Sequence, residues 1–482
     1  METHNPLNIT LDRSAIRQLL PVVTLLLCGL GAAAQGTEFS PYSRHGLGLG
    51  SSYVPPVQAG LGGLSTLAAD GYTFSASNPA SAGALISTTF QVSSHGTRLG
   101  LWEEGAGDFA AANTGSIGPM SLAFKRIGGK NALVLGMIPA YQTGYAITQS
   151  SDVDGVGSIA KTYDGLGGIS NAHVGWARSF RSSKTVPAGA ADSVEVQGLH
   201  LHLGAQVHYL FGSVERTSRL DILDPSFLDN RTTTSMRHRG VGYDVGLLMD
   251  QLLVARYKGD RSFEKSITLR IGASLEATDS LETEYRRLAE NTQTFGGVVT
   301  SVDTASFAEF TASSALPMAI KAGAALMFEH GNGRRVFLGA EISRKDWSLM
   351  NDDASGINWM GTGWKWGTET RLGVGLQWLP GNAEQRNPFW GSATYRVGFN
   401  TSTLPLTRES NDATLDAWTV SAGLSVPMRG SRSASRVHFG MDFGQRQMND
   451  GIGLQEEITN VHIGFTLNPF YKNIWLTPRL YD

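Results

Sequence analysis

The chain has 482 residues, of which 58 are glycine, so about one residue in eight is glycine against an average near 7%. Charged residues make up only 17%, and 42 acidic against 39 basic side chains leave a net charge of −3. The glycines do not recur at every third position, which excludes collagen, and 10 Trp, 13 Tyr and 20 Phe argue against disorder. The near-neutral balance gives no case for nucleic-acid binding.

The N-terminus predicts export. Arg13 and Arg17 precede an apolar run over 19–30, and three alanines follow as a small-residue cleavage site. Residues 1–34 are therefore expected to be a cleaved signal peptide. The only cysteine, Cys28, lies inside this segment, so the mature chain is expected to hold no disulfide and no thiolate metal site.

Alternation of apolar and polar residues at period two recurs along the rest of the chain and indicates β-strands. In 199–211, for example, apolar side chains alternate with His200, His202 and His208. No later segment has eighteen consecutive apolar residues, and a closed barrel is the structure that crosses a membrane without them. Fourteen strands are expected near 87–94, 119–126, 131–149, 170–180, 199–211, 241–253, 266–277, 317–328, 336–344, 368–379, 391–400, 417–426, 436–444 and 459–468.

Long and short connections alternate between these segments. Odd-numbered connections such as 212–240 and 278–316 are long, and even-numbered ones such as 127–130 are short, except 181–198. Long loops on one side and short turns on the other are typical of outer-membrane barrels. A soluble β-sandwich also alternates, but it has no reason to sort its connections this way. The predicted fold class is therefore all-β, a 14-stranded antiparallel transmembrane β-barrel.

Residues 35–86 do not follow the strand pattern and are rich in Gly, Ser, Ala and Pro. A disordered linker is one interpretation, and a compact plug inside the lumen is the other. Twelve strand glycines fall on the less apolar face, where they either let another backbone approach or ease barrel curvature. Both explanations stay open at this stage. These glycines are Gly136, Gly175, Gly204, Gly246, Gly272, Gly323, Gly339, Gly375, Gly398, Gly423, Gly440 and Gly464.

Several short motifs resemble those of FadL-family outer-membrane proteins, and most closely the FadL-like branch of bacteria that use type IX secretion. The motifs are SPYSRHGLG at 40–48, GLGGL at 60–64, NPAS at 78–81, GLGGI at 165–169, YLFGS at 209–213, LP at 316–317, DWS at 346–348 and GQR at 444–446. The resemblance implies a 14-stranded barrel closed by an N-terminal hatch that contains Asn78, Pro79 and Ala80. It also implies passive uptake of long-chain fatty acids or other hydrophobic compounds, with hatch rearrangement and lateral release through the wall.

The expected order is a signal peptide (1–34), a hatch (35–86), a barrel (87–470) and a periplasmic tail (471–482), in the outer membrane of a Gram-negative bacterium. The tail departs from the family pattern, and Phe470 is the predicted terminal aromatic. The expected partners are the lipid bilayer, lipopolysaccharide and a hydrophobic small molecule, with a larger outer-membrane protein complex as a further candidate and no nucleic acid.

No catalytic or cofactor motif stands out. The sequence lacks Gly-x-Ser-x-Gly, His-Glu-x-x-His and a phosphate-binding loop, so no enzyme, no cofactor and no metal are expected. His200, His202 and His208 share one strand face and could approach a common metal, but polar lining of the lumen is the preferred interpretation.

Charged and titratable side chains that face inward are a better guide to function. By parity they are Lys125, Arg270, Glu276, Lys321, Glu341, Arg396, His438 and Asp442. The structural explanation is pairing among themselves or with the hatch. The functional hypothesis is that a cation among Lys125, Arg270, Lys321 and Arg396 binds a ligand carboxylate while apolar groups hold its tail.

Two function classes follow. The first is passive transport of hydrophobic molecules across the outer membrane. The alternative is a non-transporting FadL-like barrel that acts as a subunit or shuttle of an outer-membrane protein secretion or assembly complex, and a scaffold without either activity is a third option. Loops 220–227 and 359–366 are expected to expose apolar or aromatic residues, which suits a lipid groove or a protein docking face.

Overall fold

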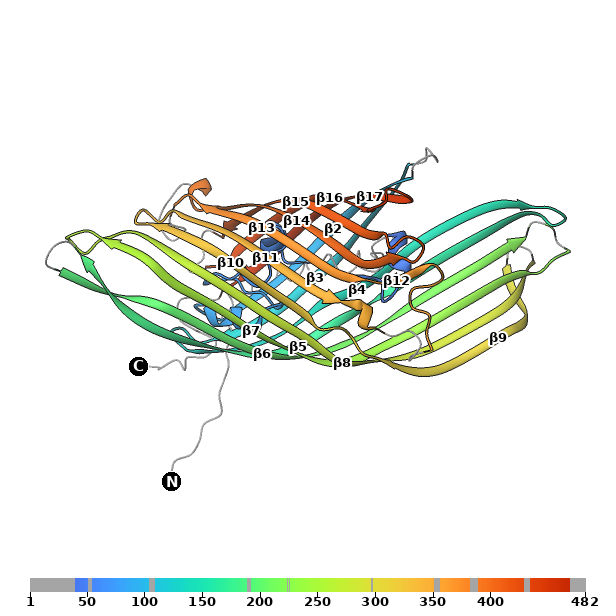
Figure 1. The fold of residues 1–482 in the computed structure, drawn as a ribbon, viewed down its shortest axis with the longest axis horizontal. Coiled ribbons are helices and arrows are strands. Elements are labelled where there is room, and N and C mark those ends of the chain that lie inside the picture. Colours follow the sequence, from blue (N-terminus) through green and yellow to red (C-terminus); the bar gives the residue numbers. More distant parts are fainter. Residues whose placement is uncertain are drawn as a thin grey trace, which may run out of the picture.

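The computed structural model describes residues 40–50, 54–103, 109–188, 192–222, 224, 226–295, 298–350, 356–381, 389–428 and 434–468. The predicted signal peptide, Phe470 and the predicted tail lie outside these residues. Within the described part, no helix is both long and apolar enough to cross a membrane. The strands form a single antiparallel sheet that closes on itself, because β17 pairs with β2 (Figure 1).

The predicted number of barrel strands is confirmed. Strands β2 to β17 fill fourteen positions, because β9 and β10 both pair with β8, and β12 and β13 both pair with β14. The strands are β2 (Thr89–Glu103), β3 (Phe109–Lys125), β4 (Asn131–Val153), β5 (Gly157–Ala188), β6 (Asp192–Ile222), β7 (Asp229–Tyr257), β8 (Phe263–Phe295), β9 (Val298–Ser314), β10 (Ala319–His330), β11 (Arg335–Asp346), β12 (Trp364–Trp366), β13 (Thr368–Leu379), β14 (Thr394–Arg408), β15 (Thr414–Pro427), β16 (Arg436–Met448) and β17 (Leu454–Leu467).

The two faces of the barrel wall have opposite polarity. Apolar side chains such as Leu133, Leu135 and Met137 of β4 are exposed on the outside. Charged side chains such as Lys125 and Arg270 are buried on the inside. This distribution is the reverse of that in a soluble protein, and it is the arrangement that a bilayer around the barrel requires.

Two connections that were expected to be loops are strands instead. Residues 212–222 continue β6 and 229–240 extend β7, while 278–295 continue β8 and 298–314 form β9. The prediction failed because both faces of these segments carry mainly polar residues, so the segments lack the apolar face by which strands were recognised. Their pairing is supported by cross-strand ion pairs, for example Arg231 with Glu290 at 2.8 Å. In the exceptional connection, 181–188 and 192–198 likewise continue β5 and β6.

These continuations make six strands much longer than a membrane needs. A strand crosses a bilayer with about 9–11 residues, whereas β8 alone has 33. Whereas the continuation of β5 and β6 beyond residue 181 extends at the end where β2 starts and β17 ends, most of the excess projects as one sheet from the opposite end of the barrel (Figure 1, right). We call this sheet the wing. It comprises 145–153 of β4, 157–167 of β5, 214–222 of β6, 229–239 of β7, 281–295 of β8, and β9.

The segment before the barrel lies inside it (Figure 1, blue). We call residues 40–50 and 54–86 the plug. The plug contains η2 (Pro41–Arg44), β1 (Leu49–Gly50), α2 (Pro56–Ala59) and η3 (Pro79–Ala84). The plug packs against the barrel wall: Leu61, Leu64 and Leu67 bury their side chains in one cluster with Ala325 and Phe337 of the barrel. The boundary at residue 86 that the sequence suggested stays a prediction.

The lumen-facing glycines make room for the plug. A Cβ at Gly398 would lie 2.0 Å from the Gly62 nitrogen, and one at Gly246 would lie 2.1 Å from Oδ1 of Asn78. Nine of the twelve glycines face plug atoms in this way, and Gly136, Gly175 and Gly339 face neighbouring barrel residues. Close approach of another backbone therefore explains most of this glycine excess.

Apolar residues close the wing end of the lumen. Trp347, Trp359 and Met360 pack against Leu47 and Leu49 of the plug, and all five are buried. The expectation that 359–366 exposes its aromatic residues was wrong, since Trp359 is only 1% exposed. Phe227, in the other loop considered, is 41% exposed as expected.

Candidate functional site

The barrel wall has an opening between β3 and β4. These strands pair only where Met120–Lys125 faces Ala132–Met137. Beyond that point β3 stays with β2 and β4 stays with β5. Pro119 has no N–H for the ladder, and Pro139 lies at a register shift of β4, so the ladder cannot continue regularly. The two prolines therefore mark where the strands separate.

The opening is lined mainly by apolar side chains. It encloses about 570 Å³ between Ile117 and Met120 of β3, Met137 of β4 and Ile169 of β5. Met120 and Met137 are 43% and 44% exposed on the outer surface of the barrel. A hydrophobic molecule in this opening would therefore contact apolar groups on its way to the lipid.

At the opening one edge of β4 has no β3 residues to pair with, and the plug covers this edge. Leu49 and Gly50 of β1 pair with Gln142 and Tyr141 in antiparallel register. Next to this bridge the Ser40 N–H donates to the Gly144 carbonyl at 2.7 Å. Residues 40–50 thus take the place of β3 along this part of β4, and their release would widen the opening.

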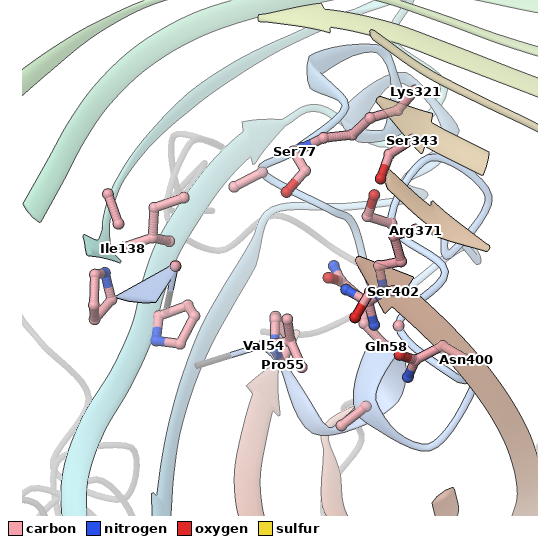
Figure 2. A pocket seen from close by; sticks show the side chains of 18 of the residues that line it. Val54, Pro55, Gln58, Ser77, Ile138, Lys321, Ser343, Arg371, Asn400 and Ser402 are labelled. Atoms are coloured by element: carbon pink, nitrogen blue, oxygen red, sulfur yellow. The ribbon is translucent and has the colours of Figure 1, made fainter. Parts of the chain in front are cut away.

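A lumen cavity of about 440 Å³ adjoins the opening and shares Val92, Pro139 and Tyr141 with it. Figure 2 shows Ile138 on one side of this cavity and Lys321, Ser343 and Arg371 on the opposite side. Toward the opening the lining mixes apolar Ile138 and Ala140 with polar Ser121 and Asn171, and the far wall is charged, an arrangement that can hold an amphiphile.

One carboxylate, that of Glu341 on β11, accepts hydrogen bonds from four groups of the plug. Its oxygens accept hydrogen bonds from the backbone N–H groups of Ser65 (2.9 Å) and Thr66 (2.7 Å). The hydroxyls of the same two residues donate to it at 2.7 Å each. Glu341 is 7% exposed, so these charge-assisted bonds are shielded from water.

The predicted hatch residues lie where the plug meets β6 and β7. Asn78 precedes η3, and its Oδ1 accepts from the Ala80 N–H at 3.1 Å as an N-cap. Its amide nitrogen donates to the Leu247 carbonyl of β7 at 3.1 Å. Pro79 and Ala80 lie against Gly204. These three residues therefore fasten the plug to the wall opposite α2.

All eight inward residues predicted by parity lie on the lumen side, but the four cations have different surroundings. Lys125 donates to the Gly83 carbonyl of the plug. Arg270 pairs with Asp250 at 2.7 Å and also donates to the Leu67 and Ala69 carbonyls of the plug.

The other two cations contact barrel side chains. Arg396 donates to Gln377 at 2.7 Å and to Ser425. Lys321 approaches Glu276 at 3.6 Å, and of the four it is the one that lines the lumen cavity. A ligand role for this set stays a prediction, and the geometry directs attention to Lys321.

Two of the three histidines predicted to line the lumen have hydrogen-bonding partners, and the His200 ring lies 6.2 Å from that of His202. His202 contacts the Ser179 hydroxyl at 2.9 Å, and His208 contacts Asp244 at 3.2 Å. Among the described residues no group of three or more His, Cys, Asp or Glu is placed to hold a metal ion.

His45 of the plug anchors residues 40–50 at the mouth. Its Nδ1 lies 2.6 Å from the Met360 carbonyl, and its ring lies 4.9 Å from that of Trp364. Burial, reinforced by the positive charges of Arg44 and Arg216, lowers the pKa of His45 to about 4. The ring is therefore neutral at pH 7, with the proton on Nδ1 donated to the carbonyl.

The resemblance implied lateral release through the wall, but the position of the opening was not predicted. Pro119 and Pro139 within strand-like segments were the available signal, because proline in a strand marks an edge or a break. Glu341 was placed in the lumen, but its binding of Ser65 and Thr66 was not foreseen.

A closed 14-stranded barrel with an apolar outer surface, a plugged lumen and an opening in its wall defines an outer-membrane β-barrel of the FadL-like class. A family model for BamG matches residues 15–482, so the chain belongs to the BamG family. No curated protein matches the chain.

Solved structures with a similar fold include two toluene transporters. TbuX of Ralstonia pickettii is 13% identical with a TM-score of 0.48, over 86% of this chain and 98% of that one. TodX of P. putida is 14% identical with a TM-score of 0.49, over 87% and 99%. A Pseudomonas aeruginosa FadL homologue is 12% identical with a TM-score of 0.41, over 90% and 98%.

Proposed function

We propose that the protein passes hydrophobic small molecules, long-chain fatty acids among them, passively between its lumen and the outer membrane of a Gram-negative bacterium. The observation that carries this proposal is the apolar opening between β3 and β4, next to the lumen cavity. A molecule that leaves through the wall enters lipid directly and never has to cross the polar surface of the outer leaflet. No covalent step and no cofactor are involved.

The same geometry indicates what must move. The mouth cluster around Trp347 and Trp359 closes one end of the lumen, and the Glu341 contacts hold the plug below it. Residues 40–50 cover the free edge of β4. Passage therefore needs release of residues 40–50, whereas the part of the plug bound to Glu341 can stay in place. A carboxylate head group would lie near Lys321 with its chain toward Ile138.

Oleate uptake by cells that depend on this protein tests the proposal. Ile117→Trp fills the opening with a larger side chain and should lower uptake severalfold. Val397→Trp is the matched control, because Val397 is a lipid-facing residue on the outer surface of β14 and is 53% exposed. Uptake that is equal in both variants and in the wild type would contradict lateral passage.

A second candidate, a subunit of an outer-membrane protein complex, is favoured by a different observation. The wing adds a large sheet beyond the membrane-spanning part of the barrel, which passage of a small molecule does not need. The match to the BamG family is compatible with this candidate. On a native gel of membranes solubilised in mild detergent, a complex subunit should migrate with a much larger assembly, and migration as a lone barrel would contradict this function.

A further inference from the structure

The two faces of the wing differ in charge. Strand register assigns side chains to faces, and Val214 and Met236, buried in the mouth cluster, identify the lumen-side face. The opposite face carries Asp152, Asp164, Glu215, Asp221, Asp229, Glu282, Glu284, Glu290 and Glu309, together with Arg219, Arg231, Arg237, Arg239 and Arg286.

Most of the arginines on that outer face already have partners. Arg231 pairs with Glu290 at 2.8 Å, and Arg219 lies 3.8 Å from Asp164. Arg237 and Arg239 both contact Glu284. Neighbouring strands thus pair these arginines within the sheet, and with nine carboxylates against five arginines the outer face has a net negative charge.

The lumen-side face has the opposite character. Lys161 of β5 and Arg287 of β8 are exposed there, and neither forms an ion pair within the described residues. Arg216, nearer the mouth, donates to the Gly46 carbonyl of the plug. Register places one carboxylate on this face, Asp303, at the far end of β9.

Apolar side chains surround these cations. They are Ile147, Tyr163, Leu220, Ile222 and Phe310. Phe310 is 37% exposed, and its ring lies tilted against that of Tyr285 with 4.9 Å between ring centroids. The other four are half-buried. A surface with partly exposed apolar residues around unpaired cations suits coverage by a partner.

The size of the face fits a protein. Six strands at about 4.8 Å spacing, extending about ten residues of 3.3 Å beyond the mouth, give an area of about 950 Å². A stable interface buries about 800 Å² on each partner.

The edge of the wing is also open to pairing. Strand β9 pairs only with β8 among the described residues and contains no Lys, Arg or Pro, the residues that commonly protect a free edge.

We propose that the lumen-side face of the wing docks a partner protein that presents carboxylates and apolar side chains above the mouth of the barrel. Lys161 and Arg287 bind the carboxylates, and the apolar side chains around them are covered by the same partner. This inference rests on the second candidate function, membership of a protein complex, and names the surface and the chemistry of the contact.

Zero-length carbodiimide coupling in native membranes tests the contact, because it joins a lysine amine to a carboxylate that touches it. The expected product is an amide between Lys161 and an Asp or Glu of another protein, identified by mass spectrometry. Lys161→Arg should abolish the cross-link and leave the assembly intact on a native gel, since the charge is kept. The double variant Lys161→Glu with Arg287→Glu should reduce the assembly at least about tenfold.

The control is Arg286→Glu, which reverses an exposed charge beside Arg287 in sequence but on the outer face. It should leave the assembly unchanged, and so show that the double variant does not act by unfolding the wing. An assembly that survives the double variant, or altered binding of lipopolysaccharide without any protein cross-link, would overturn the docking proposal alone. A wild type that migrates as a lone barrel would instead overturn the second candidate function.

Discussion

Removal of the Glu341 carboxylate should loosen the plug without opening the barrel. In the wild type this carboxylate accepts hydrogen bonds from the backbone and the hydroxyl of both Ser65 and Thr66. Glu341→Ala leaves two buried N–H groups without their acceptor, whereas the hydroxyls can rotate toward other acceptors. The strand ladders on both sides of Glu341 do not involve its side chain.

The expected cost follows from the two N–H groups. A hydrogen bond to a charged group contributes about 1.5–3 kcal/mol, so the loss of two costs about 3 kcal/mol at the low end. About 3 kcal/mol corresponds to a change of roughly a hundredfold in the equilibrium for local release of the plug. Glu341→Gln should have a smaller effect, because the amide oxygen still accepts but carries no charge.

Hydrogen exchange measured by mass spectrometry on the protein in nanodiscs follows this equilibrium. The Ser65 and Thr66 amides should exchange roughly a hundredfold faster in Glu341→Ala, with barrel amides unchanged. Glu309→Ala, on exposed β9, is the control and should have no effect on the plug. If these two amides in Glu341→Ala exchange at the wild-type rate, the carboxylate does not hold the plug and the reasoning fails.

Three further changes test other parts of the account. Gly398→Val places a Cβ 2.0 Å from the plug backbone and should make residues 54–86 sensitive to protease. Gly96→Val is the control, because its Cβ meets only one atom, at 3.6 Å, and it should not increase the sensitivity. Equal sensitivity of the two variants would refute the explanation of the glycines. Because burial lowers the pKa of His45 from 6.5 to about 4, protonation favours the released state, so a fall from pH 7.5 to pH 5.5 should release residues 40–50 about tenfold more often. Protection of the Gly46 amide, corrected for intrinsic exchange, measures this release, and His45→Gln should show no such dependence. Lys321→Ala should lower the uptake of oleate but not of an uncharged alkane, and equal loss for both would remove the head-group role.

The sequence predicted the barrel well because barrel strands obey a strong local rule. Alternation over 199–211 and 459–468 reflects an outer face in lipid and an inner face in the lumen, and the parity of Lys125 and Arg270 follows from the same rule. The wing lacks this alternation. Both of its faces are outside the lipid and carry polar residues, so its sequence resembles that of a loop.

The site was harder to predict because it depends on contacts between distant segments. Nothing near Glu341 in sequence indicates that Ser65, 276 residues away, would bind it. The opening in the wall depends on where a strand pair ends, which is decided by Pro119 and Pro139 together. Each proline alone is compatible with an ordinary edge or bulge.

The most direct test of lateral passage locates the hydrophobic molecule itself. A long-chain fatty acid with a photoactivatable diazirine at the end of its chain can be added to the protein in vesicles, illuminated, and its attachment sites mapped by mass spectrometry. Labelling is expected to concentrate in 116–120 and 137–142, at the edges of the opening. Labelling spread evenly over the lipid-facing strands, with no enrichment at these segments, would contradict lateral passage.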